Sequence, residues 1–479
     1  MIESVIFFFS GSGMVMLFIL FMRINVVGSK SKLVKHRSKE PGFVDLLIYA
    51  SVVDDGVIVG KDGSLMAAWA YQGVDSNSST EAERDQVSLQ INHALSRMGS
   101  GWMIHIDAVR KPAPGYSTKD DSHFPDPVSA AIDEERREFF ERVGTLYESN
   151  YVITATYLPP LLAQQKFVEL MFDDEGVPVD SKTRTIALLN HFKRECANIE
   201  SHLSSVFRMK RLKGKTITKE DNSSVNYDAF LRWIQFCISG LDHPVILPKN
   251  PIYLDALLSG QEFWGGVVPK IGQNFIQVVS IEGFPLASSP GLINSLADLP
   301  CLYRWSTRFI FMDTHEAVGH LEKFSKKWKQ KIRSFFDQVF NSHSSNVDQN
   351  AINMVSDAQA AIAETNSGEV AQGYYTSVVV LMSESRGDLE ASARQVAKAI
   401  NHLGFAARIE TINTIDAYLG SLPGHGVENV RRPLLNTMNR ADLMPSNTVW
   451  PGKNEAPCPM YPPMAPPLMH CTTQGATPF

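Results

Sequence analysis

The N-terminal end contains a run of apolar side chains that few kinds of structure can accommodate. Residues Val5–Met22 carry no charge and are mostly Phe, Leu, Ile, Val and Met. As a helix rising about 1.5 Å per residue, the run is about 27 Å long, close to the hydrocarbon thickness of a bilayer. It is therefore predicted to be a transmembrane helix.

The charges on either side of this run indicate its orientation. Glu3 precedes it, whereas a cleaved signal peptide begins with basic residues and ends at small ones. Six basic residues follow it: Arg23, Lys30, Lys32, Lys35, Arg37 and Lys39. Because basic residues stay on the cytoplasmic side, residues 1–40 are interpreted as a retained anchor with a basic juxtamembrane segment. The bulk of the chain is then cytoplasmic, which suits its five scattered cysteines.

Strand and helix patterns alternate after the anchor. One helix is predicted from the capping box Thr80-x-x-Glu83 to a terminal Gly99, and a charged helix covers Ile132–Leu146. The predicted strands are Val57–Gly60, Leu65–Tyr71, Trp102–Val109 and Tyr151–Leu158. The first two are expected to form a hairpin.

The same order of patterns returns later in the chain. Tyr374–Met382 is predicted to be a strand, an apolar stripe then marks a helix that ends at Gly404, and Phe405–Thr411 is a further strand. The expected fold is therefore α+β, with two α/β lobes of split β-α-β character. Their expected limits are residues 41–260 and 261–443, and no RecA-like motor domain is expected.

Prolines dominate residues 444–479. Eight of them fall between Pro445 and Pro467, which is the composition of an extended linker rather than of a core. We expect Pro451–Phe479 to make few buried contacts. The chain looks cut at this point, as if the linker led to a missing domain.

Two segments imitate a phosphate-binding loop. Gly214-Lys215-Thr216 ends like the G-x-x-x-x-G-K-[ST] template, but the first glycine position is Met209. The residues before it, Val206–Lys213, are too basic for a buried strand and are interpreted as the end of a helix that begins near Lys182. The second segment, Gly56–Asp62, is one residue short and is interpreted as a strand followed by a hairpin turn.

Metal-binding and acid–base patterns are equally incomplete. His315 and His320 are five residues apart, which places them on different helix faces, and no Cys pair accompanies Cys458, His470 and Cys471. The charged run Asp133–Arg137 is interpreted as a solvated, salt-bridged helix face. No catalytic, cofactor-binding or metal-ligating residue is predicted.

A long basic helix is predicted at Gly319–Phe340. Its segment Lys323–Arg333 alternates six cations with apolar residues at helical spacing. Such a helix can lie on anionic lipid or on a partner, or it can pack on the core with its basic face exposed. The formal charge of the whole chain is −6, which argues against a dedicated nucleic-acid binder.

Several long strings carry a family resemblance. They are Gly99–Ala108, Phe124–Pro127, Ile132–Arg137 and the stretch from Leu422-Pro423-Gly424-His425-Gly426 to Met460-Tyr461-Pro462-Pro463. In this order they resemble the CagE/TrbE/VirB family, whose TrbE members are conjugal-transfer ATPases of type IV secretion systems. The resemblance extends from about Lys35 to the last residue.

The resemblance implies a role as well as a fold. Family members continue past a Thr-Pro-Phe like Thr477–Phe479 into a RecA-like motor, so ATP and Mg²⁺ are implied only for that domain. The implied function is membrane docking and assembly of a conjugation ATPase at the bacterial inner membrane. The implied partners are inner-membrane secretion components, other TrbE-like subunits and, through residues 5–22, lipid.

Two alternatives remain open. One is a stand-alone enzyme with an unrecognised acid–base site around Asp54, Asp55 and His105. The other is an inactive product of a truncated or split gene.

Overall fold

The computed structural model describes residues 42–478 except 74, 76–78, 160–178, 219–223, 249–251, 286–287, 340–348, 429–430, 449–452, 454, 457, 466–470 and 474. The chain divides into two compact units, residues 1–47 and 48–479. The first contains a short described helix, α2 (Phe43–Leu46). All other described elements belong to the second unit.

The apolar run at the N-terminal end cannot be compared with the structure. Val5–Met22 and the basic segment after it lie outside the described residues, so the anchor stays a prediction. Among the residues that are described, no helix combines the length and the apolar composition that a membrane crossing needs.

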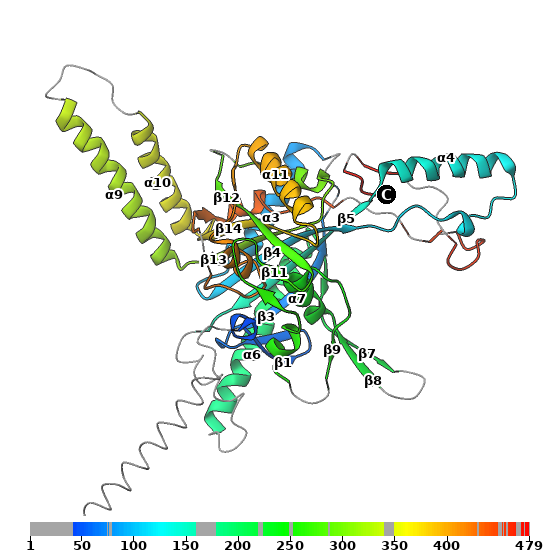
Figure 1. The fold of residues 1–479 in the computed structure, drawn as a ribbon. Helices are drawn as coiled ribbons and strands as arrows, with labels where there is room; N and C mark the ends of the chain where they lie inside the picture. The colour runs from blue at the N-terminus through cyan, green and yellow to red at the C-terminus, as the bar shows by residue number, and fades with distance from the viewer. Residues whose placement is uncertain are drawn as a thin grey trace, which may run out of the picture. The chain divides into compact units, whose positions relative to one another are not determined.

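One antiparallel sheet of 13 strands organises the second unit (Figure 1). The strand order is β1-β2-β3-β5-β4-β13-β14-β12-β11-β10, and β6, β15 and β16 pair with β3, β12 and β14. The strands are β1 (Tyr49–Asp54), β2 (Val57–Gly60), β3 (Leu65–Gln72), β4 (Trp102–Pro112), β5 (Tyr147–Tyr157), β6 (Arg208–Arg211), β10 (Phe263–Trp264), β11 (Lys270–Ile271), β12 (Asn274–Gly283), β13 (Tyr303–Phe311), β14 (Gln372–Ser383), β15 (Ala406–Ile409) and β16 (Leu434–Asn436). A small second sheet contains β7 (Gly214–Thr218), β8 (Ser224–Asp228) and β9 (Ile246–Leu247).

Two strand triplets in the large sheet have split β-α-β connections. Helix α3 (Glu81–Leu95) joins β3 to β4 while β5 lies between these strands, and α11 (Arg386–His402) joins β14 to β15 while β12 lies between them. Since each neighbouring pair is antiparallel, the outer strands of each triplet run parallel. Pairing of β4 with β13 places strands from both predicted lobes in one sheet.

Helices cover both faces of this sheet. On one face α3, α6 (Val179–Leu203), α11 and α13 (Thr437–Asp442) enclose a continuous apolar core that includes Trp69, Trp305 and Val396. The other face carries α7 (Ala229–Ser239), α8 (Leu254–Leu258) and α12 (Thr414–Leu419). Short 3-10 helices occur at Lys119–Asp121 and Asn294–Asp298.

Two further helical features lie at the margins of the sheet. Helices α9 (Thr314–Val339) and α10 (Gln349–Ser367) pack side by side as a hairpin (Figure 1). Helix α4 (Pro127–Val143) begins five residues before the predicted Ile132. The reason is local, because the Asp126 side chain accepts from the Ser129 amide and Pro127 suits the first helical position.

Two local predictions are wrong. Residues 208–211 form the edge strand β6 and not the end of a helix, since α6 stops at Leu203. An edge strand tolerates this basic sequence because alternate side chains reach solvent, while Arg211 lies over the Trp69 ring at 4.5 Å. Helix α3 ends at Leu95 rather than at Gly99, and the left-handed conformation occurs at Gly101, with φ +86°.

The expectation of few buried contacts in the proline-rich segment is wrong for its last described residues. Arg110 donates to the carbonyl of Gly475 and, at 3.2 Å, to Thr477 Oγ1. The Tyr147 amide donates to the Ala476 carbonyl at 2.8 Å. Residues 475–478 therefore pack against β4 and β5, because Arg110 on β4 and the Tyr147 amide on β5 donate to their oxygens.

Candidate functional site

The central strands β4 and β13 carry polar side chains on the face that α7 and α12 cover. His105 and Asp107 occupy alternate positions of β4, and Arg304, Ser306 and Arg308 do the same on β13. The register sets Asp107 opposite Ser306 and His105 opposite Arg308. All five side chains are buried. Four of the five are ionisable groups gathered on two neighbouring strands.

An ion pair forms the middle of this network. Arg304 Nη1 is 2.9 Å from Asp107 Oδ1, with side-chain exposures of 5% and 0%. Burial raises the pKa of Asp107, while Arg304 acts in the opposite direction. The same guanidinium donates to the carbonyl and the hydroxyl of Ser421, at 2.8 and 2.7 Å. Arg304 thus holds the segment that follows α12 against the sheet, and Asp107 balances its charge.

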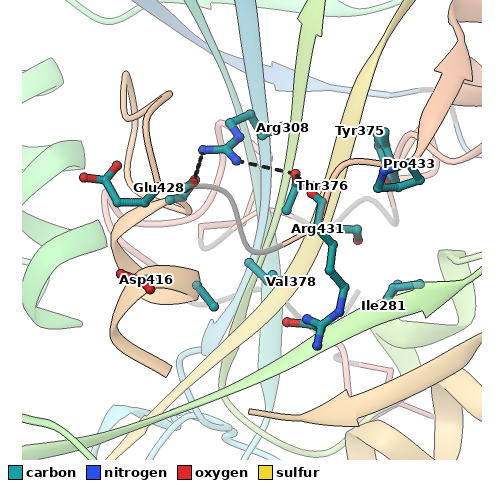
Figure 2. Close-up of a pocket in the computed structure, with 13 residues that line it drawn as sticks. Ile281, Arg308, Tyr375, Thr376, Val378, Asp416, Glu428, Arg431 and Pro433 are labelled. Carbon is teal, nitrogen blue, oxygen red and sulfur yellow. Dashed lines mark hydrogen bonds between the residues drawn. The ribbon is translucent and has the colours of Figure 1, made fainter. Parts of the chain in front are cut away.

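Arg308 holds the same segment farther along. Its Nη1 donates to three carbonyls, those of Gly420, His425 and Glu428, at 3.3, 2.9 and 2.7 Å. Figure 2 shows this guanidinium between Glu428 and Thr376. Burial lowers the pKa of Arg308 to about 10, so it keeps its charge at neutral pH. The segment 420–428 is therefore fixed to β13 at both ends.

The cavity drawn in Figure 2 is too small for a substrate. Its volume is about 10 Å³, and it is lined by Ser280, Arg308 and Asp416 among others. A single water needs about 10–15 Å³ of such space. The buried Ser280 Oγ and Arg308 Nε have no partner among the described residues, so they suit one ordered water.

Glycines allow the segment to approach the sheet. Gly424 has φ +84°, and a Cβ there would lie 2.2 Å from Met66 Sδ on β3. The neighbouring Pro423 carbonyl accepts from the Tyr49 hydroxyl at 2.7 Å, and the His425 ring stands edge-on to Tyr49. The Leu422–Gly426 string thus spans strands from β1 to β13.

The side chains of the network are closed to solvent. His105 is fully buried, and its Nε2 lies 3.4 Å from the Gly420 carbonyl. Burial and the nearby Arg308 hold the pKa of His105 well below its usual 6.5. We call the buried residues His105, Asp107, Arg304, Ser306 and Arg308 the lock, because its two arginines hold residues 420–428 against the sheet.

The residues of the alternative acid–base site are not brought together. His105 is on β4, whereas Asp54 ends β1, and β2, β3 and β5 separate these strands. Asp54 forms an ion pair with Lys193. Asp55 accepts from the Gly214 amide at 2.8 Å.

The contact between Asp55 and the Gly214 amide bears on whether Gly214-Lys215-Thr216 can bind phosphate. The tripeptide lies in strand β7, which forms a hairpin with β8. A phosphate cradle needs free backbone amides, but the Gly214 amide already faces the Asp55 carboxylate, which repels phosphate. Gly56–Asp62 forms β2 and the turn into β3, as predicted. Both segments contain strand residues instead of the strand–loop–helix arrangement of a phosphate-binding loop.

The remaining candidates lie apart from the network. His320 on α9 contacts Glu316 and Tyr374, at 3.9 and 3.5 Å. Cys458 is exposed, and His470 lies outside the described residues. Where the structure describes the chain, no group of three or more metal-ligating side chains occurs.

The prediction of a solvated face at residues 133–137 is wrong for Asp133. Its carboxylate is buried, accepts from the Tyr116 hydroxyl at 2.7 Å and pairs with Arg137. The interaction holds the segment before α4 against the helix. On the basic helix α9, Lys323, Lys326 and Lys327 are exposed, while the side chains from Trp328 onward lie outside the described residues.

Sequence reasoning missed the arginines and the aspartate of the lock. The signal was present, because His105 and Asp107, and then Arg304, Ser306 and Arg308, recur with the period of two that marks one face of a strand. Polar residues with this period suggest a solvated face. Their burial depends on the 420–428 segment, which is more than 100 residues away in the sequence.

Comparisons with known proteins place this fold in a family. Residues 56–165 match the profile of the type IV secretion system ATPase VirB4/TrbE N-terminal domain. Residues 215–431 match that of the CagE, TrbE, VirB family, component of type IV transporter system. The chain is also 45% identical over 446 residues, 92% of its length, to the conjugal transfer protein TrbE of Rhizobium radiobacter. The chain belongs to the CagE/TrbE/VirB family.

Two further CagE/TrbE/VirB relatives come from Sinorhizobium fredii, and each is named as one portion of a probable conjugal transfer protein TrbE. The first portion is 49% identical to the chain over 125 residues, and the second is 45% identical over 289 residues. The matches cover 26% and 60% of the chain, and 84% of the first portion and 43% of the second. Since 54% of the Rhizobium radiobacter protein is covered, the chain spans about half the length of the longer relatives that it matches.

Proposed function

We propose that this chain is the membrane-docking and assembly region of a TrbE-like conjugation ATPase. In this proposal residues 1–40 anchor it in the bacterial inner membrane, the bulk lies in the cytoplasm, and it supports conjugative DNA transfer and assembly of a pilus or mating channel. The relatives' names support the conjugal-transfer role. The uncharged run Val5–Met22 supports the anchor.

The proposal of a docking role rests on the burial of the polar network around Arg304. A catalytic site needs groups that can reach a substrate, but His105, Asp107 and Arg304 are buried under residues 420–428. These charges hold residues 420–428 on the sheet, and the rest of the surface remains available for contacts with partner proteins. We therefore assign the chain a docking role rather than a reaction of its own.

We do not assign nucleotide binding to the residues of this chain. The two segments that imitate a phosphate loop contain strand residues instead of the strand–loop–helix arrangement, and the aligned region covers 54% of the Rhizobium radiobacter relative. We propose that ATP and Mg²⁺ bind in the region of such relatives that the alignment does not reach. The partners proposed for this chain are inner-membrane secretion components and other TrbE-like subunits.

Cell fractionation tests the docking role. The full chain and a variant lacking residues 1–34 are expressed with and without the other transfer genes. We expect the full chain in the membrane fraction in both backgrounds, and the shortened variant there only when the transfer genes are present. Recovery of the shortened variant in the soluble fraction of both backgrounds would refute docking through the cytoplasmic region. Its recovery in the membrane fraction without those genes would refute the anchor.

A nucleotide assay tests the assignment of ATP binding. The purified chain should hydrolyse no ATP, and Lys215→Ala should leave nucleotide binding unchanged. An ATP affinity in the micromolar range that this substitution abolishes would contradict the assignment.

A further inference from the structure

An open cleft lies on the same sheet face as the buried lock. Its volume is about 500 Å³, within the range of about 300–1,000 Å³ found for ligand sites. We call it the α7 cleft, because α7 forms one wall and strands β3, β4, β5 and β6 form the floor and the opposite edge.

The floor is apolar with a few amides. The register places Ala70 beside Val152, and Asn150 beside Val109. On the edge strand β6, Lys210 pairs with Ala70 and Arg208 with Gln72, so both cations belong to the same face. The floor can therefore accept an apolar side chain while the β6 edge offers positive charge.

The charges on the two sides of the cleft differ. On the α7 side Arg232 and Lys111 share Asp242, at 2.5 and 3.6 Å, and Lys111 also lies 3.1 Å from Glu148. Arg208 and Lys210 are exposed and form no ion pair with any described residue. The positive charge of the cleft that no described carboxylate balances therefore lies on the β6 edge.

A largely buried tryptophan forms part of the other wall of the cleft. Trp233 on α7 is 8% exposed and lines the cleft, and its Nε1 is buried with no hydrogen-bond partner among the described residues. One face of its ring is occupied by Phe236, which stacks on it at 5.8 Å. Because Nε1 is closed to solvent, it is not available to a ligand in the cleft.

We propose that the α7 cleft binds an acidic segment of a partner protein. Carboxylates of the segment meet Arg208 and Lys210, and an apolar side chain lies over Ala70 and Val152. The inference rests on the proposed docking function and adds the chemistry of the partner.

A nucleic acid fits the cleft less well. The carboxylates of Asp242 and Glu148 flank the side opposite β6, where they would repel a phosphate backbone. The stacked Phe236 leaves Trp233 poorly placed for a base. A peptide carboxylate that binds at the β6 edge is on the side away from Asp242 and Glu148, and it does not need to stack on Trp233.

Peptide binding to the purified, detergent-solubilised full chain tests the proposal. The probe is a fluorescein-labelled peptide of about ten Glu, Leu and Gly residues, and a peptide with Gln in place of Glu is its control. Binding is measured by fluorescence anisotropy up to about 1 mM. The test variant is Arg208→Glu/Lys210→Glu. The matched control is Lys323→Glu/Lys327→Glu, which reverses two exposed lysines on α9.

We expect the Glu peptide to bind, and its affinity to fall at least about tenfold in the cleft variant but not in the α9 variant. The proposal is overturned if the Gln peptide binds equally well, if the cleft variant binds as the native chain does, or if no binding is detected.

Two other occupants are tested in the same assay. A 12-residue thymidine oligonucleotide that binds more tightly than the Glu peptide, and loses affinity in the cleft variant, would make this a nucleic-acid surface. Self-association that sedimentation detects in the native chain and not in the cleft variant would make it a contact between copies. Either result overturns the proposal. Because the assay needs no membrane or transfer genes, its failure is distinguishable from failure of the docking role in cells.

Discussion

The lock beneath residues 420–428 and the α7 cleft lie on one face of one sheet, yet they use charge in opposite ways. In the lock Arg304 and Asp107 are buried and paired, and Arg308 Nη1 donates to three carbonyls. In the cleft Arg208 and Lys210 are exposed without an ion pair to a described residue. Paired and closed charges fix structure, whereas open and unpaired charges remain available for recognition.

The strongest test of this contrast removes one partner of the lock. Asp107→Asn leaves the Arg304 charge buried without its counterion, and breaking a buried pair in this way costs about 3–5 kcal/mol. We expect urea denaturation to show a loss of that size in the free energy of unfolding. The double variant Asp107→Leu/Arg304→Met should lose less, because no lone charge remains. Equal losses would mean that packing, and not charge, dominates.

A smaller loss is expected where the covering segment touches β3. Gly424→Ala forces a side chain into a left-handed conformation and against Met66, so we expect a loss of about 1–3 kcal/mol. Gly115→Ala is the control, since its Cβ would meet nothing within 4 Å. If both variants denature at the same urea concentration, the segment is not held as closely as the structure indicates.

The pH dependence of stability should change by a smaller amount. His105 has its pKa depressed in the fold, so the unfolded chain binds a proton more readily as pH falls below 6.5. Stability should therefore decrease from pH 7 to pH 5, by at most about 1.4 kcal/mol per pH unit from this group. His105→Gln should flatten the curve of melting temperature against pH. An unchanged curve would show that other groups control it.

The smallest effect on stability is expected at the cleft. Arg208→Glu/Lys210→Glu changes exposed side chains, so the free energy of unfolding should stay within about 0.5 kcal/mol of the native value. Thermal melting checks this. A large loss in the free energy of unfolding would mean that Arg208 and Lys210 stabilise the fold, as the charges of the lock do. The contrast between the two regions would then be wrong.

The sequence predicted the local elements better than the contacts between them. The Thr80 capping box, the β2–β3 hairpin and the strand–helix–strand order at both ends are all present, because each depends on neighbouring residues. The helix predicted to extend to Lys213 fails, because pairing with β3 turns Arg208–Arg211 into a strand.

The candidate site was less predictable than the fold. Asp107 resembles a surface residue until Arg304 and Ser421, from distant regions of the chain, cover it. The same holds for Gly475 and Thr477, which look like linker residues and become buried only through Arg110. Periodicity carries no information on such distant partners.

The pairing of β4 with β13 also sets an order of events during synthesis. Asp107 and its partner Arg304 are separated by 197 positions. At a synthesis rate of about 5–20 residues per second, β4 leaves the ribosome on the order of 10–40 s before the strand that completes its edge. During that interval an apolar strand edge is open to other chains. We therefore expect the yield of folded protein to depend on translation speed and on chaperones, more than its final stability suggests.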